Sequence, residues 1–433
     1  MKSISRRDLL KVTSVLGCTG VGLHFGYNAL KDPLVKLDEA LSRAVNDLPA
    51  ASISAAIIKN NKLYWSKNYG YQDIPSRTLM TTDSAWQTIG SISKLVVWTA
   101  IMRLVDQGVL DLQTDISDYL GFNLRSPHYP DSKITIHNLL THSSSLSSRK
   151  LMSAPYPMAD SFCRDNYETL EAWVLKTLPP SGSHYSAEAA FDNYKPGDYS
   201  KISNDPLGVI AGYSNLNAVV AAYIVERATG LDFKTYCDNE IFSPCGMVQT
   251  SWSKEKLPQL ITHYEAESSP RSPIMAVYTK AMLDQGYASK EAVLNKEGKK
   301  YIDFTDCDYF SSVYPMGLLG TSLQSFLPFL LAHLNEGKVN GYQLLKPETV
   351  KEIFSYQRKD TQIGSELGLG WFRNADSKGN VSWGHDGGGP GILSSAHINP
   401  EQGTGVVLFI NNFHVNYTLR AKLLKTMNEI AIS

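Results

Sequence analysis

Strand-forming segments lie near both ends of this 433-residue chain, with helical patterns between them. Residues 51–59 and 62–71 predict two strands joined at Asn60 and Asn61, a pair that suits a tight hairpin turn. Further short strands are predicted near the C-terminus, at 381–386, 392–398 and 405–411. This order favours an α+β fold. We expect one antiparallel sheet built from N- and C-terminal segments, flanked by helices, with a mainly helical region inserted.

Apolar residues at helical spacing predict the helices of this chain. The main ones are expected at 34–47, after Ser91, at 215–230, at 322–336 and at 419–431. Two stretches lack such periodicity. Residues 150–205 are irregular and rich in proline, and residues 265–310 are polar and rich in lysine. We therefore predict one domain over 34–433, with insertions near 150–212 and 265–310.

The N-terminal segment has the pattern of an export signal. Arg6 and Arg7 precede a weakly apolar, glycine-rich stretch, which predicts a twin-arginine signal over residues 1–29 and a bacterial periplasmic location. A basic N-terminal helix on a cytosolic protein is the alternative. The stretch is too short and mild for a stable membrane span. Lipidation at Cys18 is disfavoured, because only six residues separate it from Lys11.

Composition excludes some classes of function. The net charge is −1 and no long basic run occurs, so nucleic-acid binding is disfavoured. Hydrophobic residues make up 43% of the chain, enough for a large core. The five cysteines are scattered, without a Cys-x-x-Cys or a Cys/His cluster at zinc spacing, so no metal site is predicted.

Ser91 opens an apolar helical stretch and is followed by Lys94 three residues on. The two should share one helix face, one turn apart, with Gly108 placed to end the helix. A partly desolvated lysine can act as base for a serine hydroxyl, and N–H groups at a helix start can hold an oxyanion. Ser-x-x-Lys is common by chance, and an ordinary N-cap serine is the alternative interpretation.

Two later motifs carry further candidate groups. Tyr213, Ser214 and Asn215 form the single Tyr-x-Asn of the chain, just before an apolar helix. The phenol could relay a proton and the amide could hold a carbonyl, although a core tyrosine beside a capping asparagine would look the same. His385 and Gly387 form a His-x-Gly within a glycine-rich stretch. Its backbone could approach a ligand closely, or it could simply be a hairpin turn.

Taken in this order, the three motifs resemble the serine β-lactamase and penicillin-binding-protein-like family. The likeness is closest to the class C β-lactamase, DD-peptidase and family VIII-type esterase branch, whose order is Ser-x-x-Lys, Tyr-x-Asn, then Lys-Thr-Gly or His-x-Gly. Similar stretches also occur at 134–143, at 244–247 and at 317–321. The resemblance covers about 35–430 and implies a β-lactamase/transpeptidase-like fold.

The resemblance implies an acyl-enzyme mechanism, in which Ser91 attacks a carbonyl while Lys94 and Tyr213 move the protons. The implied substrate-binding and oxyanion-hole residues are Asn215, His385, Gly387 and Gly388. His385 would contact Tyr213 or a substrate carboxylate, with a charge that depends on pH. A small-molecule or peptide substrate is implied, and neither a metal nor a cofactor is needed.

The chain also departs from the family pattern. Lys-Thr-Gly is absent, so an efficient β-lactamase is disfavoured, and Pro196-Gly197 lies well upstream of Tyr213. We therefore predict an exported serine hydrolase of an ester, an amide or a D-amino-acid peptide bond. A DD-peptidase or penicillin-binding protein with weak β-lactamase activity is one alternative, and a non-catalytic penicillin-binding-like sensor is another. The sequence leaves the oligomeric state open.

Overall fold

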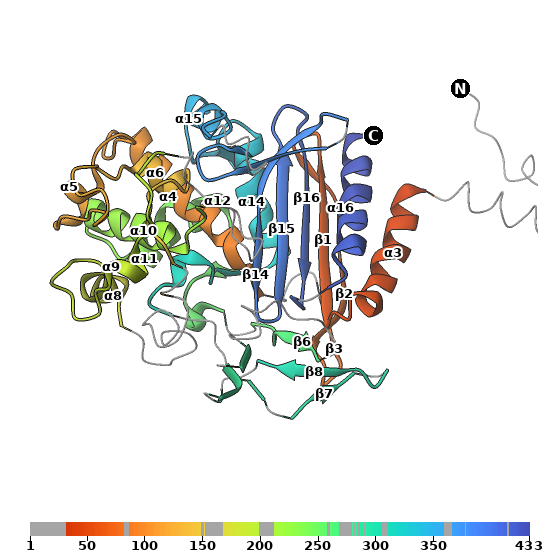
Figure 1. Ribbon diagram of the computed structural model, residues 1–433. Helices are drawn as coiled ribbons and strands as arrows, with labels where there is room; N and C mark the ends of the chain where they lie inside the picture. The colour runs from red at the N-terminus through yellow and green to blue at the C-terminus, as the bar shows by residue number, and fades with distance from the viewer. Residues whose placement is uncertain are drawn as a thin grey trace, which may run out of the picture.

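The central feature of the computed structural model is an eight-stranded antiparallel sheet in the order β12-β13-β14-β15-β16-β1-β2-β3 (Figure 1). Its strands are β1 (Ser52–Lys59), β2 (Lys62–Asp73), β3 (Thr78–Leu79), β12 (Glu366–Leu367), β13 (Phe372–Ala375), β14 (Val381–Gly389), β15 (Ile392–Asn399) and β16 (Thr404–Ile410). At its centre β1 pairs with β16, with Ile53 opposite Ile410. The two ends of the chain therefore share one sheet, which confirms the predicted α+β fold.

The structure describes the greater part of the chain. These residues are 32–81, 86–148, 151, 168–198, 212–257, 260–267, 279–304 apart from isolated positions, 311–358, 366–376, 378–413 and 415–433. The predicted export signal and Cys18 lie outside them, as do large parts of the predicted insertions. Among the described residues, no helix combines the length and apolar character that crossing a membrane requires.

The β1–β2 hairpin forms where the sequence predicts it. Asn60 and Asn61 have φ angles of 52° and 57°, the left-handed values that a tight two-residue turn requires and that asparagine tolerates well. Seven of the eight residues of β1 are buried, because helices cover both of its faces.

Helices cover the two faces of the sheet (Figure 1). On one face α3 (Pro33–Asp47) packs against α16 (Tyr417–Ile432), and both contact β1. Asp32 caps α3, which buries Leu37 and Leu41 against the sheet. On the other face α14 (Leu323–Leu334) contacts β1 and β15.

A helical region lies beyond α14 and includes α4 (Ser93–Asp106), which follows a 3₁₀ turn, η2 (Gly90–Ile92) (Figure 1). Helix α10 (Asn215–Thr229) packs against α4 and is buried from Leu216 to Val225. It ends at Gly230 in the left-handed conformation, as predicted. The remaining helices of this region include α5 (Ile116–Leu120), α6 (Ile136–Leu140), α8 (Leu170–Thr177), α9 (Ala187–Ala190), α11 (Phe233–Cys237), α12 (Ser243–Cys245) and α15 (Pro347–Ile353).

Three small sheets complete the described fold. They are β4 (Gln87–Thr88) with β9 (Gly320–Thr321) and β5 (Thr250–Ser251), β6 (Tyr264–Ala266) with β8 (Lys300–Asp303) and β7 (Val293–Leu294), and β10 (Lys338–Val339) with β11 (Tyr342–Gln343). The second sheet falls within the predicted insertion near 265–310, and its Tyr264 packs against Ile74 near the end of β2. The first sheet leads the chain directly into η2.

Candidate active site

Ser91 and Lys94 meet at the start of α4. Ser91 lies in η2, and α4 begins two residues later, at Ser93. Ser91 Oγ is 2.9 Å from Lys94 Nζ, so the predicted pairing of the two side chains is confirmed. Ser93 fastens the turn, because its hydroxyl donates to the Gly90 carbonyl at 2.6 Å and accepts from Leu319 N–H at 3.0 Å. Ser91 therefore does not act as a capping residue of α4.

Lys94 is fully buried, and this burial lowers the pKa of its amine well below the usual value. Its Nζ also donates to the carbonyl of Met316, which directs the amine. A neutral amine held in this way retains a lone pair that can accept the proton of Ser91. The environment thus prepares Lys94 for the role of a base.

Tyr213 lies beside this pair, just before α10. Lys94 Nζ is 5.2 Å from the centre of the Tyr213 ring. Burial raises the pKa of the phenol, and a side-chain contact with Ser91 partly opposes that shift. Ser214 caps α10 by accepting from Leu216 N–H at 3.2 Å. Asn215 is the first residue of the helix, and its backbone N–H donates to Ser148 Oγ at 3.0 Å.

The glycines of β14 bring a strand backbone up to Ser91. The sequence left open a glycine-rich turn here, but Gly387 and Gly388 are strand residues, and the turn comes at Gly391 with φ 68°. A Cβ on Gly387 would stand 2.3 Å from Ile89 O and 3.0 Å from Ser91 N. Only a residue without a side chain permits this approach. The Gly387–Gly388 backbone therefore packs directly against the turn that carries Ser91.

His385 lies in β14 on the same face as Gly387 and is buried. Its ring centre is 5.9 Å from that of Tyr213 and 5.0 Å from that of Phe372. Nδ1 donates to the Asp386 carbonyl, so Nε2 is an acceptor in the neutral ring. Burial and the nearby Lys94 lower the pKa of His385 to about 3. His385 therefore gains a positive charge only at acidic pH, and its ring is neutral near pH 7.

Comparison with known proteins identifies the family of this chain. The family model described as Beta-lactamase matches residues 37–191 and 200–425. The chain belongs to the beta-lactamase family. Among the curated relatives, the putative penicillin-binding protein PbpX of Bacillus subtilis is 24% identical over 330 residues, which are 72% of each chain. Esterase EstB of Burkholderia gladioli is 24% identical over 224 residues, 49% of this chain and 50% of EstB.

Solved structures show the same fold. D-amino acid amidase from Ochrobactrum anthropi superposes with a TM-score of 0.67 at 19% identity, covering 92% of this chain and 98% of the amidase. At that level of identity the likeness establishes the beta-lactamase-family architecture alone.

His142 is a site residue whose position the sequence did not reveal. It is buried, has a φ of 50°, and its ring centre is 4.6 Å from that of Tyr213. Asn217 Oδ1 accepts from Ser144, so its amide Nδ2 donates to His142 Nδ1 at 2.9 Å. The proton of the neutral ring must then lie on Nε2, which has no hydrogen-bond partner among the residues that the structure describes. The signal was present in the family-like stretch at 134–143, but a motif alone assigns no contact.

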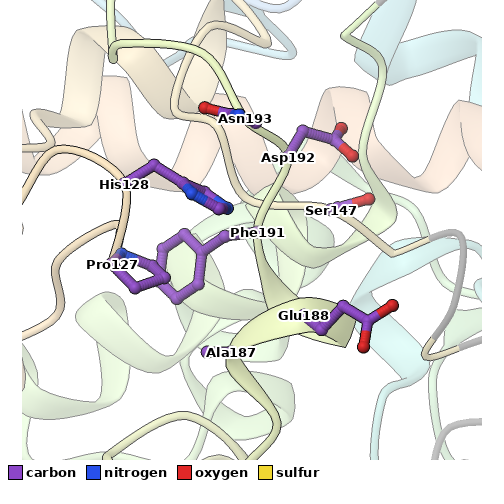
Figure 2. Close-up of a pocket in the computed structure, with 8 residues that line it drawn as sticks. All are labelled: Pro127, His128, Ser147, Ala187, Glu188, Phe191, Asp192 and Asn193. Atoms are coloured by element: carbon purple, nitrogen blue, oxygen red, sulfur yellow. The ribbon is translucent and has the colours of Figure 1, made fainter.

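A pocket of about 660 Å³ lies beside the 145–148 segment, in the helical region (Figure 2). In this view Pro127, His128 and Phe191 gather on the left, with the carboxylates of Glu188 and Asp192 on the right. Its lining does not include Ser91, Lys94 or Tyr213. One of its lining residues, Ser147, is the neighbour in sequence of Ser148, which accepts from Asn215 N–H. The described residues contain no group of three or more His, Cys, Asp or Glu side chains able to hold a metal ion.

Proposed function

We propose that this protein is a serine hydrolase that cleaves an ester, an amide or a D-amino-acid peptide bond through an acyl-enzyme on Ser91. The observation that carries the proposal is the 2.9 Å contact between Ser91 Oγ and the fully buried Lys94 Nζ. Family membership supports it, as do the names of relatives, which include an esterase and a D-amino acid amidase.

The proposed reaction begins with attack of Ser91 Oγ on the carbonyl carbon of the substrate, as Lys94 Nζ takes the serine proton. The oxyanion accepts hydrogen bonds from the N–H groups of Ser91 and Gly388. Tyr213, close to both side chains, passes the proton to the leaving alcohol or amine, which departs as the carbonyl reforms. Water then attacks the acyl-enzyme by the reverse proton path and restores Ser91.

Covalent labelling tests the proposal. A fluorophosphonate probe should add once to the protein, and peptide mass spectrometry should locate the adduct on Ser91. Ser91→Ala should abolish the label. Ser251→Ala is the matched control, because Ser251 also precedes a lysine by three residues but lies in β5, where its hydroxyl accepts from Ser253 N–H at 3.0 Å. Failure of the folded wild type to react with any acylating probe would contradict the proposal and favour a non-catalytic sensor.

The neutral state of His385 bears on the substrate class. Near pH 7 it offers a substrate carboxylate no positive charge, because burial holds its pKa at about 3. We therefore favour an ester or amide that lacks a carboxylate over a penicillin or a D-Ala-D-Ala peptide. Parallel assays with p-nitrophenyl acyl esters, D-amino acid amides, nitrocefin and a D-Ala-D-Ala peptide should show the highest kcat/KM for the first two classes.

Export is a separate proposal that depends on Arg6 and Arg7. If they form a twin-arginine signal, replacing both with lysine should leave the folded protein in the cytoplasm. Fractionation of cells expressing the wild type and the double variant gives the answer. Equal periplasmic amounts would contradict a twin-arginine route.

A further inference from the structure

The strand that borders Ser91 has few side chains with which to hold its position. Gly384, Gly387, Gly388 and Gly389 all lie in β14. Glycine loses more conformational entropy on folding than other residues and has no side chain to pack, so a strand rich in glycine is weakly held. Side chains on a strand alternate between faces, so His385 and Gly387 face the Ser91 turn whereas Asp386 faces the other way.

Asp386 is held on that rear face by two partners. Arg420 Nη2, from α16, is 2.8 Å from Asp386 Oδ2, and His397 Nε2, from β15, is 3.0 Å from Oδ1. Arg420 also donates to Ser395 Oγ, and Asn374 of β13 contacts His397 Nδ1 at 3.3 Å. This network, the Asp386 clamp, thus joins three adjacent strands to the C-terminal helix.

The charges of the clamp are well matched. The side chain of Arg420 is 13% exposed and that of His397 16%, whereas that of Asp386 is 52% exposed, so solvent reaches the carboxylate but little of its two partners. Burial alone would raise the pKa of Asp386, but hydrogen bonds and charge from His397 and Arg420 lower it well below its usual range. The two partners therefore favour the charged carboxylate form of Asp386.

The position of this strand segment matters because its other side packs against the Ser91 turn. A Cβ on Gly90 would stand 2.7 Å from Gly388 N, so the amide of Gly388 is packed directly against the turn that carries Ser91. A donor for an oxyanion must stay in place, because a displacement of about 1 Å can cost roughly 100-fold in rate.

We propose that Arg420 is a positioning residue for the Ser91 site: by holding the Asp386 carboxylate, it fixes the Gly387–Gly388 backbone against the Ser91 turn. Arg420 touches no reacting atom and acts through the strand. This inference rests on the proposed function, since it assigns Arg420 a role in forming the acyl-enzyme.

The test compares acylation rates in Arg420→Met and Arg420→Lys. Methionine keeps much of the apolar stem but removes the charge, so fluorophosphonate acylation and kcat for an acyl ester should fall about tenfold or more, with KM changed less than about twofold. Lysine restores the cation and should recover part of the rate. Asp386→Asn should also slow acylation, at least as much as Arg420→Met, because it weakens the contacts of Asp386 with both Arg420 and His397. The double variant should be slower than the slower single variant by less than the two effects combined, because the two changes share the Arg420–Asp386 contact.

Asp38→Asn is the matched control. Asp38 of α3 pairs with Lys67 of β2 at 2.7 Å on the same sheet, away from β14, so its loss should leave the acylation rate unchanged. Thermal melts establish that each variant is folded at the assay temperature. Wild-type rates in folded Arg420→Met and Asp386→Asn would overturn the inference, and if Arg420→Met does not fold, Asp386→Asn and Arg420→Lys decide it. An unreactive wild type would instead count against the proposed function.

Discussion

Lys94 shows how a single environment can change the chemistry of a side chain. Its amine is enclosed on all sides, and desolvation makes the ammonium form costly. The Met316 carbonyl accepts one N–H, which leaves the lone pair available toward Ser91. Because the pKa of Lys94 is lowered, the base form is present at lower pH than for an exposed lysine. Acylation should therefore be lost only when pH falls through that lowered pKa.

Replacing Lys94 with methionine tests this assignment. Methionine fits a buried apolar site but cannot accept a proton, so the acylation rate should fall by about 10²–10⁴-fold. In the wild type the rate should rise with pH and level off once Lys94 is neutral, whereas the residual rate of Lys94→Met should lack that limb. Stopped-flow measurement of acylation between pH 5 and 10 gives both profiles. An unchanged acid limb in the variant would assign the ionisation to another group.

Contacts between elements are what the sequence predicted least well. Local patterns were sufficient for the β1–β2 hairpin and for the end of α10 at Gly230, because turn and capping preferences act over a few residues. They placed the glycines after Asp386 outside the strand, since glycine is a poor strand former. In the fold, the close approach of β14 to η2 requires those glycines, and this tertiary requirement overrides the local preference.

Alanine substitutions at Gly387 and Gly389 distinguish two effects. One is the loss of the close approach between β14 and η2, and the other is the general effect of replacing a glycine in a strand. A Cβ on Gly387 would meet backbone and hydroxyl oxygen at 2.3 Å, whereas one on Gly389 would have 3.6 Å to Ile392. Gly387→Ala should therefore push β14 away from η2 and lower kcat about 10²-fold, comparable to removing one oxyanion donor. Gly389→Ala should retain activity within about threefold, because any gain in strand propensity is small. Equal activity of the two variants, measured with an acyl ester, would show that the strand does not need to approach Ser91.

At the scale of the whole molecule, the site depends on residues from both ends and the middle of the chain. β1 pairs with β16 at the centre of the sheet, while Ser91 and Tyr213 come from the helical region. The three motifs could be put in order from the sequence alone, and their convergence is confirmed. The sequence could not reveal the Asp386 clamp or the contact of His142 with Asn217, because the partners are distant in the chain and their residue types are common.

Buried neutral histidines make the stability of this fold depend on pH. Burial lowers the pKa of His263 to about 3 and of His333 to about 4, below the ordinary value of 6.5. In the unfolded chain these rings take up protons as pH falls below about 6.5, whereas in the fold they stay neutral until pH 3–4. The unfolded state therefore binds more protons in this window, and the free energy of unfolding should decrease as pH falls through it, by about 1 kcal/mol per histidine and pH unit.

His333 allows this coupling to be measured without touching the proposed site. Its Nδ1 donates to Phe329 O at 2.9 Å and its Nε2 lies 3.2 Å from Thr99 Oγ1, contacts that a glutamine amide can partly replace. His333→Gln should lower stability at pH 7 but lose about 1–2 kcal/mol less than the wild type between pH 7 and pH 5, because one titrating group is gone. Urea unfolding at both pH values measures the difference. The same slope in the wild type and in His333→Gln would mean that His333 has the same charge in the folded and unfolded states, and would contradict the prediction.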